Sequence, residues 1–316
     1  MRNLNCFKAY DIRGKLGEEL NDEIAYDIGA ALAQCLKPRS VVLGGDCRET
    51  SASLKAAVAR GLLDMGVDVL DIGMCGTEEV YFATDHLNAD AGIEVTASHN
   101  PINYNGMKVV GQGARPLDPA TELAAIRETA EQRTFDFPDR QGTLTSVDIR
   151  LPYARKVCSF IAPAKLKPLK VLVNAGNGAA GPAFDEIARQ LAAMGTPITF
   201  VRMDHEPDSR FPNGIPNPLL PENQPRTAAA VCAHNADFGV AWDGDFDRCF
   251  FFDHTGTFID GYYIVGLLAQ QALSAHKGAT IIHDPRMIWN TREIVADMGG
   301  TSVQASTTRS APVSSS

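Results

Sequence analysis

Short apolar runs alternate with amphipathic helical repeats along the sequence, and this alternation limits the fold most strongly. Runs typical of buried strands occur at residues 40–43, 67–72, 91–95, 107–110, 169–174, 198–203, 237–242 and 279–283. Helical spacing marks residues 21–35, 51–62, 77–87, 118–133, 148–161, 184–194, 261–275 and 289–298. Such alternation predicts α/β domains with mixed, mainly parallel sheets, whose ligands bind at the carboxyl ends of strands.

The same pattern divides the chain. Its 316 residues suffice for two or three domains. We expect a first domain over 1–143 and a second over 144–256, joined by a linker at 134–147. Residues 257–300 then give an incomplete third unit. The last residues, 301–316, are dominated by Ser and Thr without periodicity, which predicts a disordered tail and a truncated chain, as after a frameshift.

The net charge limits the possible partners, and the cysteine pattern indicates the compartment. A net charge of -9 and a pI of about 5.3 argue against nucleic acid and against anionic membrane surfaces. No apolar run reaches the length of a membrane span, and the first residues lack the apolar core of a signal peptide. The seven cysteines form no C-x-x-C pair, which favours reduced thiols in the cytoplasm.

Three aspartates at alternate positions follow the strand predicted at 237–242. Asp243, Asp245 and Asp247 stand in the run DGDFDR. In a loop that leaves a strand, this spacing can turn three carboxylates toward one point, and Mg²⁺ prefers such oxygens. A solvated acidic turn is the simpler alternative, but we favour a metal site. A calcium EF-hand does not fit, because Arg248 and His254 replace its glycine and glutamate.

A serine in a polar loop is the second candidate. Ser98 lies in TASHNP, after the strand predicted at 91–95, and Lys108 follows closely. Alone, this segment would be a turn. Beside a metal-binding loop, however, a serine that carries a phosphoryl group and a cation that offsets its charge suffice for phosphoryl transfer.

Two arginine segments could bind phosphate. The run YDIRG begins at Tyr10 and places Arg13 before a glycine, in a stretch too polar for a core. Its spacing leaves phosphate binding and a surface arginine equally open. For the run GGDCR at 44–48 we favour a tight structural turn.

A glycine-rich run supports a different function. Residues 176–181 match G-x-G-x-x-G between a strand and a helix, and Asp204 closes the next strand. That arrangement is typical of dinucleotide binding, so an NAD(P)-dependent oxidoreductase is an open alternative. It would leave Ser98 and the aspartates without a role, and the glycines could equally serve tight packing.

Taken together, the motifs resemble the phosphohexomutase family. AYDIRG, TASHNP, YNGMK, GNGAAG, FPNGIPNP and DGDFDR occur in the order typical of bacterial members of the phosphomannomutase/phosphoglucomutase group. The resemblance runs from about residue 6 to about residue 300. It implies four domains around a cleft, of which the third would be incomplete here and the fourth, which binds the distal phosphate, absent. We therefore expect little mutase turnover from this chain.

The resemblance also implies the site. Ser98 would carry the phosphoryl group, and Asp243, Asp245 and Asp247 would bind Mg²⁺ together with a phosphoserine oxygen. Further catalytic roles would fall to Arg13, His99, Lys108 and Arg248, and substrate binding to Tyr10, Arg13, Lys108 and Arg248. His99 and Lys108 are the candidates for moving the proton of the sugar hydroxyl.

The implied reaction is an isomerase-class phosphotransfer. It interconverts mannose 6-phosphate and mannose 1-phosphate through a bisphosphorylated sugar, with glucose or mannose 1,6-bisphosphate as activator, and supplies GDP-mannose synthesis. The partner is a small-molecule sugar phosphate. Two more alternatives stay open: a haloacid-dehalogenase-type phosphatase that uses Asp243 as its nucleophile, and a folded remnant without activity. Neither the preference for mannose over glucose nor the oligomeric state follows from these residues.

Overall fold

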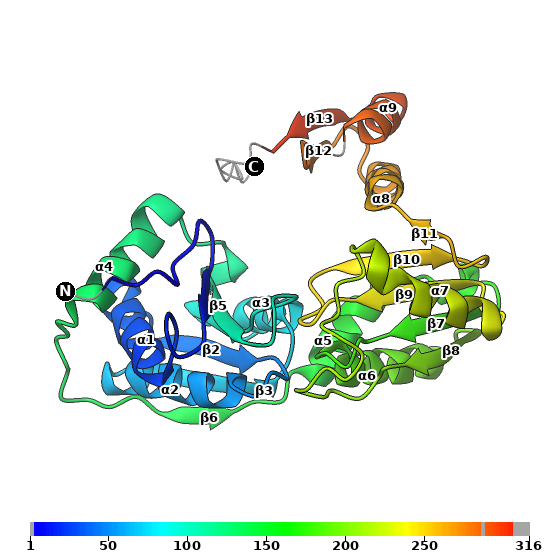
Figure 1. The fold of residues 1–316 in the computed structure, drawn as a ribbon. Helices are drawn as coiled ribbons and strands as arrows, with labels where there is room; N and C mark the ends of the chain where they lie inside the picture. Colours follow the sequence, from blue (N-terminus) through cyan, green and yellow to red (C-terminus); the bar gives the residue numbers. More distant parts are fainter. Residues whose placement is uncertain (1–2, 286–287, 306–316) are drawn as a thin grey trace.

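The computed structural model of the chain describes residues 3–285 and 288–305. Three α/β units follow one another along the chain, from blue through green and yellow to red in Figure 1. In this part of the chain no helix has both the length and the apolar character needed to cross a membrane.

A six-stranded mixed sheet forms the centre of the first unit. Its order is β1-β5-β4-β2-β3-β6, and β5 runs antiparallel to both of its neighbours. The strands are β1 (Ile12–Lys15), β2 (Ser40–Gly45), β3 (Asp68–Met74), β4 (Ala91–Val95), β5 (Tyr104–Gly111) and β6 (Leu144–Ser146).

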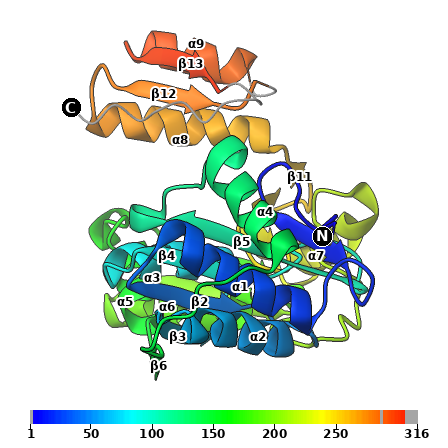
Figure 2. The same cartoon turned by 90° about the vertical axis from the view of Figure 1, so that its left-hand side faces the viewer.

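Helices cover both faces of this sheet. They are α1 (Asp22–Leu36), α2 (Ser51–Asp64), α3 (Thr77–His86) and α4 (Ala124–Gln132). The side chain of Asn21 caps α1 as expected and accepts a hydrogen bond from the Ile24 amide at 3.0 Å. Helices α1 and α2 lie side by side (Figure 2) and form the main core with α4, while α3 packs on the opposite face.

The second unit is built on a five-stranded sheet of order β11-β10-β9-β7-β8. Its strands are β7 (Leu169–Asn174), β8 (Ile198–Met203), β9 (Phe238–Trp242), β10 (Cys249–Asp253) and β11 (Phe258–Ile259). The central strand β7 runs parallel to β8 and β9. Helix α6 (Ala180–Ala193), with α5 (Arg150–Cys158) packed on it, covers one face, and α7 (Gln224–Ala233) covers the other.

A smaller third unit follows. It contains α8 (Gly261–Ala275), β12 (Thr280–His283), α9 (Trp289–Asp297) and β13 (Thr301–Gln304), and its core is the cluster of Ala269, Leu273 and Val295. Several of its large apolar side chains are exposed, namely Tyr263, Leu267, Leu268, Ile282, Trp289 and Val303. Apolar surface is therefore less completely covered here than in the first two units.

Two segments that we expected to lack regular structure contain strands. The linker at 134–147 includes β6, which pairs in parallel with β3. The expected disordered tail begins with β13, which pairs in parallel with β12. Both strands are short and polar, so they form through pairing with a neighbouring strand rather than through an apolar pattern of their own. The rest of the expected tail, 306–316, lies outside the described residues.

Other elements were not expected at all. Strands β1 and β11 lie at the edges of the two large sheets, with β10 between β11 and β9, and all three extend a mainly parallel arrangement with antiparallel pairs. Helix α7 begins at the end of the proline-rich segment 207–225. Pro225 lies in its first turn, where a proline costs no hydrogen bond.

Candidate active site

Ser98 lies in a buried turn between β4 and β5, in a segment (residues 96–103) called the Ser98 loop below. Its backbone is left-handed, with φ at 52°, a conformation that residues other than glycine adopt rarely. The Thr96 hydroxyl stabilises this turn by accepting a hydrogen bond from the Ser98 amide at 2.8 Å. As a result the Ser98 hydroxyl points at the second unit and donates to Asp243 Oδ2 at 2.7 Å.

The three aspartates converge as predicted. They lie in the loop between β9 and β10, residues 243–248, called the acid loop below. One ligand oxygen from each of Asp243, Asp245 and Asp247 can be chosen so that all lie within 4.8 Å of one another. Asp243 and Asp245 are fully buried, and Asp245 Oδ1 has no hydrogen-bond partner among the described residues. Buried carboxylate oxygens that lack a partner fit a divalent cation such as Mg²⁺.

Lys108 on β5 lies against the same carboxylates. Its Nζ is 2.7 Å from Asp245 Oδ2, 2.6 Å from Asp247 Oδ2 and 3.0 Å from the Thr77 hydroxyl. Burial opposes the charge on this amine, but the two carboxylates outweigh burial and raise the pKa of Lys108 above its usual range. The lysine is therefore a fixed positive charge at the edge of the carboxylate cluster.

The other predicted residues surround this centre to different degrees. His99 Nδ1 is 3.1 Å from the Ser98 hydroxyl oxygen, and Arg248 Nη1 lies 3.2 Å from the same ring nitrogen. Arg13 on β1 forms an ion pair with Asp11 at 2.6 Å, and its guanidinium faces the Asn100 amide in the Ser98 loop. Tyr10 precedes β1 and is 65% exposed, so it lies on the surface beside this strand.

Sequence reasoning missed the residues that hold these loops. Arg48, in the run where we favoured a structural turn, is buried and donates to carbonyls of the Ser98 loop. Asp46 accepts a hydrogen bond from the Thr96 hydroxyl at 2.7 Å. Thr77, at the start of α3, donates to Asp245 Oδ2 at 3.0 Å and also holds the Asp245 carbonyl through its amide. The available signal was the position of Asp46 and Arg48 directly after β2, beside β4 in the sheet.

The glycine-rich run at 176–181 does not form a dinucleotide cradle. A Cβ added at Gly176 would meet Pro216, at Gly178 the Gly244 backbone of the acid loop, and at Gly181 the His205 carbonyl, each within 2.7 Å. Protein atoms thus fill the space that a pyrophosphate would need. These glycines allow close packing, which was the second interpretation of the motif.

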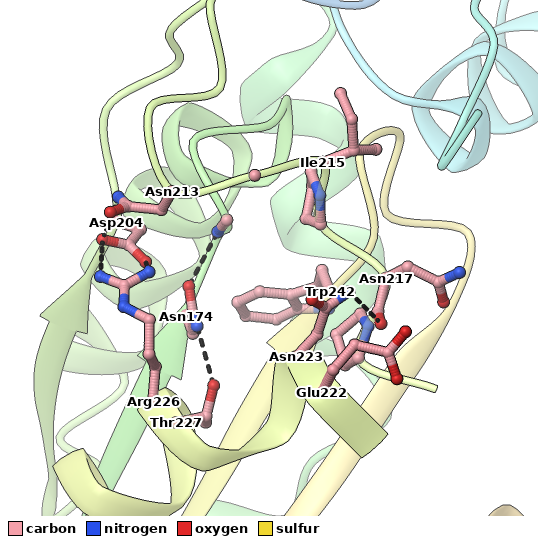
Figure 3. A pocket seen from close by; sticks show the side chains of 14 residues that line it. Asn174, Asp204, Asn213, Ile215, Asn217, Glu222, Asn223, Arg226, Thr227 and Trp242 are labelled. Atoms are coloured by element: carbon pink, nitrogen blue, oxygen red, sulfur yellow. Dashed lines mark hydrogen bonds and ion pairs between the residues drawn. The ribbon is translucent and has the colours of Figure 1, made fainter. Parts of the chain in front are cut away.

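The cavity beside this run is also too small for a dinucleotide. It measures about 110 Å³, whereas cofactor pockets usually span roughly 300–1,000 Å³. Figure 3 shows that Asp204, the expected ribose ligand, instead pairs with Arg226 at 2.8 Å, and that Asn174 bonds Thr227 at 2.9 Å. The oxidoreductase alternative finds no support here. Neither does the haloacid-dehalogenase alternative, because both oxygens of the Asp243 carboxylate accept hydrogen bonds, one from the Ser98 hydroxyl and the other from the Arg248 amide.

Comparisons with known proteins identify the family of this chain. Models of the phosphoglucomutase/phosphomannomutase family match the chain as α/β/α domain I over residues 4–136 and as domain II over residues 152–256. The chain is 56% identical over 311 residues to a phosphomannomutase of Salmonella montevideo, covering 97% of this chain and 68% of the relative. It is also 56% identical, with the same coverage, to a phosphomannomutase of Escherichia coli.

A solved structure gives the same result. A phosphoglucomutase/phosphomannomutase family protein from Burkholderia thailandensis superposes with a TM-score of 0.87 at 32% identity, covering 96% of this chain and 66% of that one. The chain thus spans about two thirds of the length of these relatives. With the family models, the sequence identity and the fold in agreement, the chain belongs to the phosphoglucomutase/phosphomannomutase family.

Proposed function

We propose that this chain carries the phosphoryl-transfer centre of a phosphomannomutase, with Ser98 as the residue that holds the phosphoryl group. The observation that carries the proposal is the 2.7 Å contact between the Ser98 hydroxyl and Asp243, because it joins a nucleophile from one unit to a carboxylate cluster from the next. The substrates would be mannose 6-phosphate and mannose 1-phosphate, as the names of the similar proteins suggest.

The three aspartates and a phosphoserine oxygen would hold Mg²⁺ in this centre. When bound, the ion offsets the negative charge that accumulates on the transferring phosphoryl group. Lys108 and Arg248 supply fixed positive charge around the same point, and Arg13 lies beside the Ser98 loop. These cations would orient the sugar phosphate and lower its repulsion from the phosphoserine.

Transfer would proceed by exchange of one P–O bond for another. The bond between phosphorus and Ser98 Oγ breaks as a bond to a sugar hydroxyl oxygen forms, and the hydroxyl gives up its proton. The proton of the sugar hydroxyl ends on the departing Ser98 Oγ, and His99 is the candidate to carry it, because its ring nitrogen lies 3.1 Å from Ser98 Oγ while Lys108 is held by two carboxylates. The bisphosphorylated sugar would turn over and return its other phosphoryl group to Ser98, with glucose or mannose 1,6-bisphosphate as activator.

Two less specific expectations accompany this proposal. The domain boundaries would lie near 143/144 and 256/257, although strand β6 (144–146) still pairs in the first sheet and strand β11 (258–259) in the second, so each sheet ends three residues past the proposed boundary. The seven cysteines are all free, which fits a reducing compartment such as the cytoplasm.

Mass spectrometry of the protein after incubation with glucose 1,6-bisphosphate and Mg²⁺ tests the proposal directly. Phosphate should appear on the Ser98 peptide and be absent from Ser98→Ala. A coupled assay for conversion of mannose 1-phosphate, run beside glucose 1-phosphate, then tests the substrate. Phosphate on Asp243 instead of Ser98 would contradict the proposal, and a clear preference for glucose 1-phosphate would correct the sugar.

A further inference from the structure

Arg48 is a buried cation just after the end of β2 in the first unit. Its side chain is 1% exposed, although a guanidinium is rarely buried without a function or a full set of acceptors. Asp46, its nearest carboxylate, lies 3.5 Å from Arg48 Nε, too far for a good hydrogen bond. The buried ion pair with Asp46 therefore includes no good hydrogen bond from the guanidinium, and Arg48 Nε has no hydrogen-bond partner among the described residues.

Backbone carbonyls of the Ser98 loop surround the guanidinium instead. Arg48 Nη2 donates to the carbonyls of Ser98 at 2.9 Å and Asn100 at 2.6 Å. Its Nη1 donates to the carbonyls of Pro101 at 3.0 Å and Tyr104 at 3.3 Å. One planar side chain thus gathers four carbonyls between Ser98 and the start of β5, which only arginine can do.

These contacts account for the strained turn. A left-handed conformation at Ser98 is costly and persists only where surrounding contacts enforce it. The Ser98 carbonyl is held by Arg48 on one side, and on the other it lies so close to Gly244 that a Cβ there would come within 2.6 Å of it. Arg48 and Gly244 thus fix the Ser98 carbonyl from two sides. The orientation of the Ser98 hydroxyl toward Asp243 follows from this arrangement.

The second unit reaches the same guanidinium. Phe211, in the motif FPNGIPNP, places its ring 5.6 Å from Arg48 Cζ and is itself buried. Two residues on, Asn213 bonds Asp204 at 2.9 Å and Asn177 at 3.0 Å (Figure 3 shows Asn213 beside Asp204), which fixes this segment to the second sheet. The Phe211 ring, which belongs to the second unit, therefore covers the Arg48 guanidinium of the first unit.

We infer that Arg48, covered by Phe211, is a positioning residue that holds the Ser98 loop in the geometry needed for phosphoryl transfer. It touches no reacting atom and acts through the Ser98 backbone. The effect on phosphoryl transfer rests on the proposed function, whereas the effect of Arg48 on the shape of the Ser98 loop does not. It assigns a role to two motifs, GGDCR and FPNGIPNP, that the reaction itself leaves unexplained.

Arg48→Lys tests the inference, because lysine keeps the charge but cannot serve four carbonyls at once. Arg133→Lys is the matched control, since Arg133 pairs at 3.0 Å with the buried Asp27 of α1, outside the Ser98 loop. Two quantities are measured in each variant: amide hydrogen exchange in peptides covering 97–106, and the single-turnover rate of Ser98 phosphorylation by glucose 1,6-bisphosphate.

Arg48→Lys should speed exchange in 97–106 at least tenfold, while Arg133→Lys leaves it unchanged. The maximal phosphorylation rate should fall at least tenfold, since small misplacements of a reacting group cost about 10²-fold. The half-saturating bisphosphate concentration should change less than about threefold, because no sugar contact is removed. Wild-type exchange in this peptide, or an equal rate loss in Arg133→Lys, would overturn the inference.

Phe211→Leu provides a second test should Arg48→Lys fail to fold. It keeps the guanidinium and removes the ring, so exchange in 97–106 should rise by a smaller factor, about two- to fivefold, and unchanged exchange would contradict the role of Phe211. If wild-type protein takes no phosphate on Ser98, the proposed function fails, while the exchange measurements still decide whether Arg48 shapes the loop.

Discussion

The Ser98 loop and the acid loop meet at one point but are held in different ways. Side chains hold the Ser98 loop, chiefly the Arg48 guanidinium and the Thr96 hydroxyl. Main-chain groups hold the acid loop: the amides of Ala179 and Thr77 donate to the carbonyls of Gly244 and Asp245 at 3.0 and 3.1 Å. Single side-chain changes should therefore disturb the serine more readily than the metal ligands. We expect larger effects on the metal ligands only where a substitution removes a charge beside the acid loop or adds atoms against it.

Lys108→Met should have the largest effect on stability. Removing the ammonium leaves the buried Asp245 facing Asp247 without a cation, and breaking a buried ion pair costs about 3–5 kcal/mol. Chemical denaturation in EDTA measures the loss, and Mg²⁺ should reduce it because the metal replaces the missing charge. Lys55→Met, which breaks the part-buried pair with Asp71, is the control and should not respond to Mg²⁺. Equal responses of the two variants would argue against a metal at the acid loop.

Glu79→Gln should remove one source of pH dependence from the support of the acid loop. Glu79 caps α3, whose first amide holds Asp245, and burial raises the pKa of its carboxyl to about 7. In the unfolded chain this carboxyl loses its proton near pH 4.5, so wild-type stability should fall as pH rises from 4.5 to 7. Glutamine keeps the hydrogen-bond acceptor and cannot ionise. The free energy of unfolding of the variant should therefore rise relative to that of the wild type by up to roughly 3 kcal/mol between pH 4.5 and 7.

Denaturation curves at half-unit pH intervals check this difference. Parallel profiles for the two proteins would show that Glu79 titrates normally in the folded state.

Gly76→Ala should disturb the acid loop through volume alone. An added Cβ would come within 2.5 Å of the Asp245 carbonyl and closer still to the Phe246 ring, while the Gly76 backbone, at φ -115°, is open to alanine. Overpacking of this kind costs about 1–3 kcal/mol and should weaken Mg²⁺ binding measured by calorimetry. Gly111→Ala serves as the control, since its nearest neighbour is the exposed end of the Arg115 side chain at 3.3 Å, outside the acid loop that Gly76 contacts. Unchanged Mg²⁺ affinity in Gly76→Ala would mean that the loop can shift without consequence.

Thr77→Val should have the smallest effect. It deletes the hydroxyl that contacts Asp245 and Lys108 but keeps the amide that holds the Asp245 carbonyl. We expect a loss of about 1 kcal/mol in stability and only a few-fold loss in Mg²⁺ affinity. A loss as large as that of Gly76→Ala would show that side chains, and not the main chain, determine the shape of the acid loop.

The sequence predicted the reacting groups better than their supports. Ser98 and Asp243 each follow an apolar strand, and strand ends of α/β units collect ligands, so their approach could be anticipated. The partners of Arg48 are backbone carbonyls, which no residue pattern identifies. Strands β6 and β13 depend on a neighbour for pairing, and the glycines at 176–181 fit packing and nucleotide binding equally well until Pro216 and Gly244 are seen against them.

The position of the two loops in the chain has a consequence for synthesis. Ser98 and Asp243 are 145 residues apart, and ribosomes add about 5–20 residues per second, so roughly 7–30 s separate their appearance. The first unit has its own buried core and can begin to fold in this interval. During that time the nascent serine has none of its aspartates, so under the proposed mechanism it cannot react with the sugar bisphosphates around the ribosome. The serine can therefore react only after synthesis has reached the acid loop of the second unit.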